Sequence, residues 1–173
     1  MRRDDVLAYP DQIGDALWRV EAAGVPTGPV DVCGVAHGAG ELAAQVVGGR
    51  GVSSGDRIAV CASYSGDDEE ALACFDRAGR GVAVCTAGAL AARAREEGAP
   101  VVGVPAGLSE PRAAVVYFTV AAVMCAAPQL KAELEAASAT LTRLANGEEP
   151  GLETPTESVL GERLKRDLAS AEP

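Results

Sequence analysis

Hydrophobic residues along this chain fall into short runs that alternate with amphipathic stretches. Residues 10–23 begin the pattern, because Ile13, Leu17 and Val20 recur on one face of a helix. Runs of nearly continuous Val, Ile, Ala and Cys follow, and each run precedes a helical pattern. This alternation is typical of parallel strands that helices cover on both faces. The sequence therefore predicts an α/β domain with strands at 30–34, 57–62, 81–87 and 100–105, and with helices at 41–47, 68–78, 89–98 and from residue 111 onward.

The carboxyl-terminal part of the chain departs from this alternation. Residues 129–144 have the pattern of an amphipathic helix, and residues 146–155 are polar and contain Gly and Pro. In residues 129–144 the apolar face of the predicted helix is formed by Leu130, Leu134, Leu141 and Leu144. Residues 156–173 have a second helical pattern, whose apolar face is formed by Leu160, Leu164 and Leu168. We therefore expect a domain at residues 1–145, a linker at 146–155 and a carboxyl-terminal helix at 156–173 that covers this domain or another subunit.

Length, composition and charge narrow the class of protein. The 173 residues fit one domain, and the 48% apolar and 23% charged residues are typical of a globular chain. The net charge is −10, from 25 acidic and 15 basic residues. Such a surface repels phosphate backbones and anionic lipids, so we expect neither a nucleic-acid partner nor a membrane partner. The longest apolar segment, residues 113–127, is too short to span a bilayer comfortably and is expected to be a buried helix.

Five cysteines are present, and their spacing is not that of a metal site. The sequence accordingly predicts no metal and no cofactor. An odd number of cysteines favours reduced thiols in a cytoplasmic protein, and the first residues lack the apolar run of a signal peptide. Cys33, Cys61 and Cys85 lie in or beside the predicted strands, where we expect them to serve as small buried hydrophobic residues.

Three loops that follow predicted strands, at residues 34–40, 63–68 and 105–111, carry the candidate chemistry. In parallel sheets the carboxyl ends of the strands form the ligand-binding edge, where helix N-termini point. Ser63 and Ser65 stand between a strand and a helix, so their hydroxyls and the backbone N–H groups favour an anion. Ordinary turns and caps use the same residues, so this loop alone predicts either an anion site or a structural turn.

Two motifs stand out in these loops, SYSGDDEEA at residues 63–71 and PRAAVVY at residues 111–117. They resemble motifs of the bifunctional phosphoglucose/phosphomannose isomerases, members of the sugar isomerase (SIS) superfamily. The family has Ser-Tyr-Ser-Gly-Asn-Thr-Glu-Glu-Thr at the first motif and Pro-Arg-Ala-Ala-Leu-Gly-Tyr at the second. The spacing, the intervening GVPAGL and the opening YPDQIGDALWRV also fit. The resemblance therefore covers most of residues 8–145.

This resemblance implies a three-layer α/β/α fold with a flavodoxin-like parallel sheet and a sugar-phosphate site at the carboxyl edge of that sheet. In the family the Ser/Thr loop holds the phosphate, and the arginine of the second motif stabilises the enediolate that forms as a proton moves between C1 and C2. Ser63 and Ser65 would accordingly bind ligand, and Arg112 would be the electrostatic catalytic residue. The other ligand-binding positions that the resemblance implies are Gly34, Gly66 and Asp68. Family members dimerise, which implies a homodimer or a complex with a second SIS-type chain.

The sequence also departs from the family pattern. The first loop, Gly-Met-Gly-Gly-Ser-Ala in the family, reads GVAHGA at residues 34–39. Asp67 and Asp68 replace Asn and Thr. These carboxylates either decorate a helix N-terminus, which is favourable by ~0.3–1 kcal/mol each, or indicate a cationic or hydroxyl-rich ligand. In the family a second domain supplies the proton-transferring groups, and we find no counterpart of them in these residues. The single histidine, His37, is a candidate base, a hydrogen-bond donor or a turn residue.

Three functions therefore stay open. The first is isomerisation of an aldose and a ketose, of the glucose 6-phosphate or mannose 6-phosphate type, by a protein reduced to one SIS domain. Its catalytic residues would be Arg112 and His37, and a partner chain would supply a missing base. The second is a non-catalytic module that binds a carbohydrate derivative as a sensor or regulator. The third is a structural subunit that assembles through its apolar helix at 111–127 and its carboxyl-terminal leucine stripe.

Overall fold

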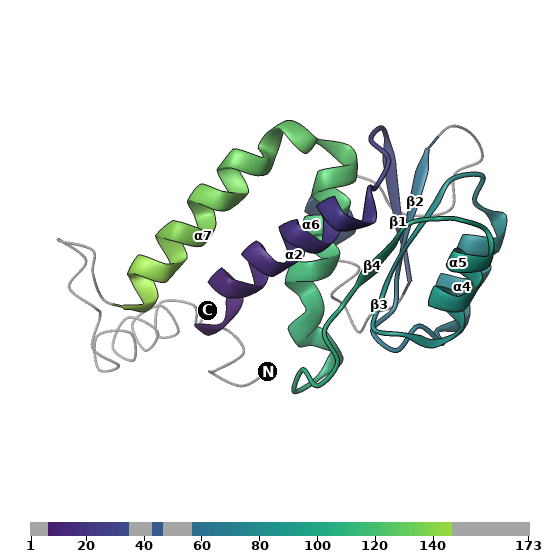
Figure 1. The fold of residues 1–173 in the computed structure, drawn as a ribbon, viewed down its shortest axis with the longest axis horizontal. Helices are drawn as coiled ribbons and strands as arrows, with labels where there is room; N and C mark the ends of the chain where they lie inside the picture. Colours follow the sequence, from purple (N-terminus) through teal and green to yellow (C-terminus); the bar gives the residue numbers. More distant parts are fainter. Residues whose placement is uncertain (1–6, 35–42, 47–56, 147–173) are drawn as a thin grey trace, which may run out of the picture.

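A computed structural model describes residues 7–34, 43–46 and 57–146 (Figure 1). Four strands form one parallel sheet in the order β1-β2-β3-β4. Their bounds are β1 Val30–Cys33, β2 Ile58–Ala62, β3 Gly81–Cys85 and β4 Val101–Gly103. One face of the sheet is covered by α4 (Glu69–Arg77) and α5 (Gly88–Glu96), and the other by α2 (Tyr9–Ala23) and α6 (Val115–Ala126). The fold is therefore the predicted three-layer α/β/α arrangement with a flavodoxin-like parallel sheet.

The observed elements follow the predicted alternation, but the strands are shorter than the apolar runs. The run at 100–105 contributes only Val101–Gly103 to the sheet, and the run at 81–87 stops at Cys85. The helix predicted from residue 111 begins with a 3₁₀ turn, η1 (Pro111–Ala114), before α6 starts. The helix expected at 41–47 is described only at residues 43–46, where it is helical.

Two hydrophobic layers hold the sheet between its helices. Along β2, Ile58 and Val60 face the α2 and α6 side, whereas Ala59 and Cys61 face the α4 and α5 side. All five residues of β2 are buried, which agrees with a central strand that has helices on both faces. The sheet therefore presents only its edges and its loops to solvent or to a ligand.

The helix α6 lies inside the subunit. Eight of its twelve residues are buried against the sheet and α2. This confirms the expectation of a buried helix for the apolar segment at 113–127. Most of its apolar surface is therefore covered within the chain, and the assembly role considered for this segment stays a prediction.

Tyr117, the last residue of the second motif, ties α6 to α2. Its hydroxyl donates to Asp15 Oδ2 at 2.9 Å, and Arg19 Nε donates to the same oxygen at 2.7 Å. Arg19 Nη1 also donates to the carbonyl oxygen of Gly103 at 3.1 Å, which adds the end of β4 to the network. Burial, and then the bond to Asp15, raise the pKa of Tyr117. The motif's tyrosine is therefore a hydroxyl donor that fixes the packing of α2.

We expect Tyr117→Phe to lower the stability of the protein by about 1 kcal/mol, because one partly buried hydrogen bond to a carboxylate is lost. Thermal unfolding should show a decrease of about 2–4 °C in Tm for a chain of this length. The matched control is the same substitution in an Asp15→Ala background. There it should change Tm little, and an equal decrease in both backgrounds would contradict the network.

The helix α7 (Lys131–Ala145) forms an arm beside α2 that extends away from the sheet (Figure 1). It follows a short 3₁₀ turn, η2 (Pro128–Leu130). None of the fifteen side chains of α7 is buried, and Leu141 and Leu144 are 39% and 41% exposed.

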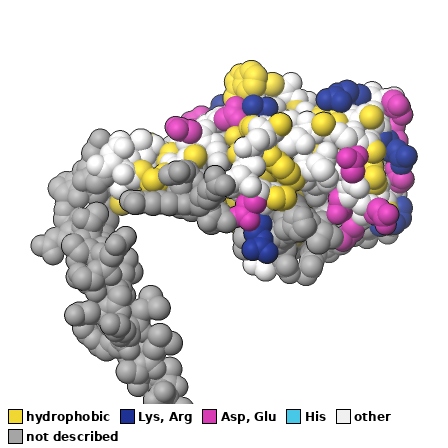
Figure 2. Space-filling view, turned by 90° about the horizontal axis from the view of Figure 1, so that it is seen from below, with side chains coloured by type: hydrophobic (Ala, Val, Ile, Leu, Met, Phe, Trp, Pro, Cys, Tyr) yellow, Lys and Arg dark blue, Asp and Glu magenta, His cyan; other side chains and the backbone are white. Residues whose placement is uncertain are grey.

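On the face shown in Figure 2, hydrophobic side chains are exposed in the middle of the molecule, whereas charged side chains gather at the end formed by α4 and α5. The carboxyl-terminal helix predicted at 156–173 lies outside the described residues.

Cys33 and Cys74 form a disulfide that joins the end of β1 to α4, with their Cα atoms 6.2 Å apart. The expectation of reduced thiols is therefore wrong for these two residues. They are 41 residues apart in sequence, and only the packing of α4 on the sheet brings them together. Cys61, Cys85 and Cys125 are free and buried, as expected for Cys61 and Cys85.

None of the helices in the described part of the chain has the length and hydrophobicity of a membrane span.

Candidate functional site

The loop after β2 holds the two serines in defined positions. Ser63 is buried, and its Oγ accepts a hydrogen bond from Gly66 N at 3.0 Å. Ser65 is exposed, and its Oγ accepts from Asp67 N at 3.2 Å. A serine oxygen that accepts a backbone hydrogen bond still has its own O–H hydrogen to donate. Both hydroxyls therefore keep a donor, and that of the exposed Ser65 is open to an anionic group at this edge of the sheet, whereas Ser63 is only 2% exposed.

The two aspartates of this loop act as helix caps. Asp68 is the N-cap of α4, and its Oδ1 accepts from Ala71 N at 2.9 Å. Asp67 reaches across to the next helix, where its Oδ1 accepts from Ala89 N at 2.8 Å in the first turn of α5. Helix N-termini stabilise such carboxylates. Of the two interpretations left open by the sequence, the geometry supports a structural one for both residues, including Asp68 that the resemblance places among the ligand-binding positions.

The loops after β2 and β3 interlock closely. Gly66 has φ +86°, and a Cβ atom built there would lie 1.9 Å from the carbonyl oxygen of Ala87. Gly88 has φ +76°, and its Cβ would lie 2.6 Å from the carbonyl oxygen of Ser65. The backbone N–H of Thr86 donates to the carbonyl oxygen of Tyr64 at 2.9 Å, and its hydroxyl donates to the same oxygen at 2.7 Å. The position of Ser65 is therefore set by the neighbouring loop as well as by its own.

The end of β1 approaches the same region. Gly34 has φ +106°, and a Cβ atom there would lie 2.1 Å from the carbonyl oxygen of Ala62 and 3.3 Å from Ala71 Cβ. Only a glycine fits at this distance and in this backbone conformation. Gly34 therefore lets the end of β1 lie directly against Ala62, the residue before Ser63. His37 lies outside the described residues.

Tyr64 links the serine loop to the loop that leads to Arg112. Its hydroxyl accepts from Leu108 N at 3.1 Å, which joins the loops after β2 and β4. Three residues later η1 begins, and the side chain of Arg112 within it is exposed. Figure 1 shows the start of α6 at the lower edge of the sheet, next to the loop that follows β4. The serine loop and the arginine segment therefore share one edge of the molecule through Tyr64.

The structure thus brings most of the predicted site to one edge of the sheet. Gly34, Ser63, Ser65 and Gly66 lie where β1 and β2 end, and Arg112 follows the loop that Tyr64 contacts. Thr86 and Gly88, which shape the serine loop from the end of β3, were not predicted as part of the site. The signal for them was present in the sequence TAG at residues 86–88, a small polar turn after a predicted strand like the one at 63–66.

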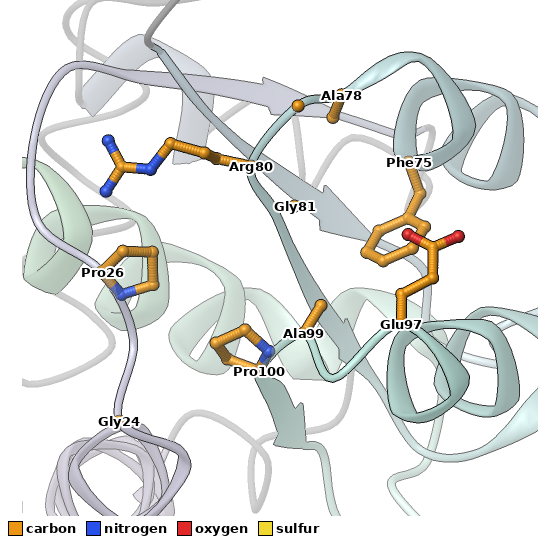
Figure 3. A pocket seen from close by; sticks show the side chains of 10 residues that line it. Gly24, Pro26, Phe75, Ala78, Arg80, Gly81, Glu97, Ala99 and Pro100 are labelled. Carbon is orange, nitrogen blue, oxygen red and sulfur yellow. The ribbon is translucent and has the colours of Figure 1, made fainter.

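A separate pocket of about 370 Å³ lies at the opposite, amino edge of the sheet (Figure 3). It is formed where β3 and β4 begin, with Arg80 on one side and Phe75 and Glu97 on the other. Ligands of open parallel sheets bind outside the carboxyl ends of the strands. This pocket therefore lies away from the predicted site. Its residues serve as a control, because a ligand of the predicted site should not affect them.

Compared with known family models, curated proteins and solved structures, the chain gives no significant match. The likeness to the sugar isomerases therefore stays a prediction from the two sequence motifs.

Proposed function

We propose that this chain is a sugar-phosphate-binding domain of the sugar isomerase kind, with the loop after β2 as its phosphate-binding element. The observation that carries the proposal is the orientation of the two serines. Each oxygen accepts a backbone N–H within the loop, so each O–H hydrogen is left to donate, and that of the exposed Ser65 is open to a phosphate oxygen. The N-terminus of α4 follows directly and favours negative charge. Asp67 and Asp68 engage helix amides, which reduces the repulsion that two carboxylates would otherwise exert on a phosphate.

Arg112 completes the proposed binding element. A guanidinium stays charged at any working pH and offers a planar set of donors to phosphate or to an enediolate oxygen. Its segment follows the loop that Tyr64 fixes, so Arg112 and Ser65 belong to the same edge. We assign to Arg112 the stabilisation of negative charge on the sugar, whether in binding or in an isomerisation of the aldose–ketose type.

Catalysis in this proposal depends on a base. Moving a proton between C1 and C2 requires a base within about 3 Å of the substrate. The sequence offers His37 for this role, and a second SIS-type chain could supply another group. We therefore propose that isomerase activity, where present, requires His37 or a partner subunit.

Binding should be visible as a ligand-dependent increase in Tm. Glucose 6-phosphate, mannose 6-phosphate and fructose 6-phosphate at 100 times Kd would each stabilise the native state by about 2.7 kcal/mol. We expect Ser65→Ala and Arg112→Ala to weaken binding about tenfold or more, because each removes a hydrogen bond to a charged group. Arg77→Ala, an exposed arginine at the far end of α4, is the matched control and should bind like the unaltered protein.

A coupled isomerase assay on the same variants then separates catalysis from binding. Turnover that disappears in His37→Ala while the Tm shift remains would support the enzymatic form of the proposal. Turnover that survives Arg112→Ala would place the site elsewhere. The absence of any Tm shift with all three sugar phosphates would remove the binding proposal itself.

The second candidate is a non-catalytic regulatory or structural subunit. Its support comes from Asp67 and Asp68, which occupy the positions of an amide and a hydroxyl in the family and serve here as caps. Sugar phosphates that bind without turnover in any oligomeric state would favour this candidate.

We also propose that the chain works as a homodimer or with a second SIS-type chain. The support is the arm formed by α2 and α7, where Trp18 is 64% exposed and Leu141 and Leu144 of α7 are also exposed. We further propose a cytoplasmic location. The reducing environment of the cytoplasm would favour the thiol forms of Cys33 and Cys74.

A further inference from the structure

Three cysteines from three different elements meet in the core between the sheet and α4. Cys33 ends β1, Cys61 lies directly opposite it in the register of β2, and Cys74 comes from α4. Their sulfur atoms all lie within 4.8 Å of one another. Cys61 and Cys74 are 0% exposed and Cys33 is 6% exposed. The sulfur atoms therefore form a compact group that is closed to bulk water.

The surroundings of this group disfavour an isolated charge. The same apolar cluster contains Ala71, Phe75 and Ala83. A free thiolate is therefore not stable here, and any bound ion has to leave the group close to neutral.

Ligand number and charge together select the class of ion. Among the described residues, no fourth Cys, His or carboxylate joins the group, whereas structural zinc takes four ligands. Three thiolates with a divalent ion would carry a net charge of −1, and with a monovalent ion −2. Three thiolates with a trivalent ion are neutral. Three bonds of about 2.3 Å, the length of a zinc–thiolate bond, place their sulfurs at most about 4 Å apart, and the three sulfurs of this group lie within 4.8 Å of one another.

We propose that Cys33, Cys61 and Cys74, when reduced, form a three-thiolate site for a trivalent thiophilic ion of the arsenite or antimonite class. In the structure Cys33 and Cys74 are joined by a disulfide, so the oxidised protein offers one thiol and the site is closed. Two electrons and two protons from a dithiol convert this disulfide to two thiols, and the dithiol becomes a disulfide. Arsenous acid then exchanges its three hydroxyl groups for three protein sulfurs, the three thiol protons leave in three water molecules, and the arsenic keeps its oxidation state.

The test is a titration of the full chain with arsenite after reduction by a phosphine, which opens the disulfide without adding a competing thiol. Native mass spectrometry should show one arsenic atom per chain in place of three protons, together with near-ultraviolet thiolate–arsenic absorption. Circular dichroism should confirm that the protein remains folded. The unreduced protein should bind no arsenite.

Variants separate this site from the other cysteines. Cys61→Ala leaves the disulfide pair intact and should weaken arsenite binding by about tenfold or more, because even an outer-shell partner of a metal site contributes about 10–100-fold to affinity. Cys61→Val provides a second variant that fills the space if the alanine protein is unstable. Cys125→Ala, in the layer on the other face of the sheet, should bind like the unaltered protein. Equal affinity in the Cys61 variants, or tighter binding of zinc than of arsenite, would overturn the proposal.

Discussion

Replacing Gly66 with alanine should destabilise the protein by about 3 kcal/mol or more. The residue has φ +86°, a conformation that costs a side-chain-bearing residue about 1–2 kcal/mol. A Cβ atom would also lie 1.9 Å from the carbonyl oxygen of Ala87, and relieving such an overlap costs about 1–3 kcal/mol more. Thermal unfolding should show Tm lowered by about 6–12 °C. The loops after β2 and β3 would have to separate, which would also displace Ser65.

The matched control for this substitution is Gly79→Ala. Gly79 has no atom within 4 Å of a built Cβ and no positive φ, so we expect a change within about 0.5 kcal/mol. Equal effects of the two substitutions would mean that the loops do not interlock as described. A stable Gly66→Ala protein that has lost sugar-phosphate binding would instead show that the loop can move without unfolding the domain.

Reducing the disulfide between Cys33 and Cys74 should have the second large effect. The bond closes a loop of about 41 residues, and chain entropy alone then predicts a stabilisation of about 4 kcal/mol. Reduction with a phosphine should therefore lower Tm by about 8–16 °C. The measurement is thermal unfolding with and without the phosphine, with a thiol assay in denaturant to confirm that two new thiols have formed.

The double variant Cys33→Ala/Cys74→Ala is the control for this effect. It should melt near the reduced protein and should not respond to the phosphine. Unchanged Tm after complete reduction would mean that the packing of α4 on the sheet holds β1 without the bond.

The sequence predicted the sheet well because each strand combines β-branched residues with burial on both faces. Ile58 and Val60 of β2 are examples, since neither helix propensity nor an amphipathic pattern competes for them. The ends of the strands were less predictable. Thr86 continues the apolar run of β3 in sequence, but its hydroxyl and its N–H both turn to Tyr64.

The pattern of hydrophobic and polar residues could not predict contacts between segments that are distant in the sequence. The pairing of Cys33 with Cys74 depends on how α4 lies across β1 and β2, which no local spacing encodes. Asp67 illustrates the same limit within the site. The sequence left open whether it decorates the N-terminus of the helix that follows it or faces a ligand, whereas in the structure it accepts from Ala89 N of α5, 22 residues away in sequence. The residue types indicated a capping role, and the tertiary arrangement determined which helix receives it.

The central claim, that a sugar phosphate binds at the carboxyl edge of the sheet, can be tested most directly by titrating glucose 6-phosphate into the isotopically labelled protein and following backbone amide shifts by NMR. The amides of residues 63–68, 108–110 and 112 should shift together along one saturation curve, and those of Gly79, Arg80 and Ala99 at the opposite pocket should not move. Shifts confined to the opposite pocket, or no shifts at saturating ligand, would contradict the account.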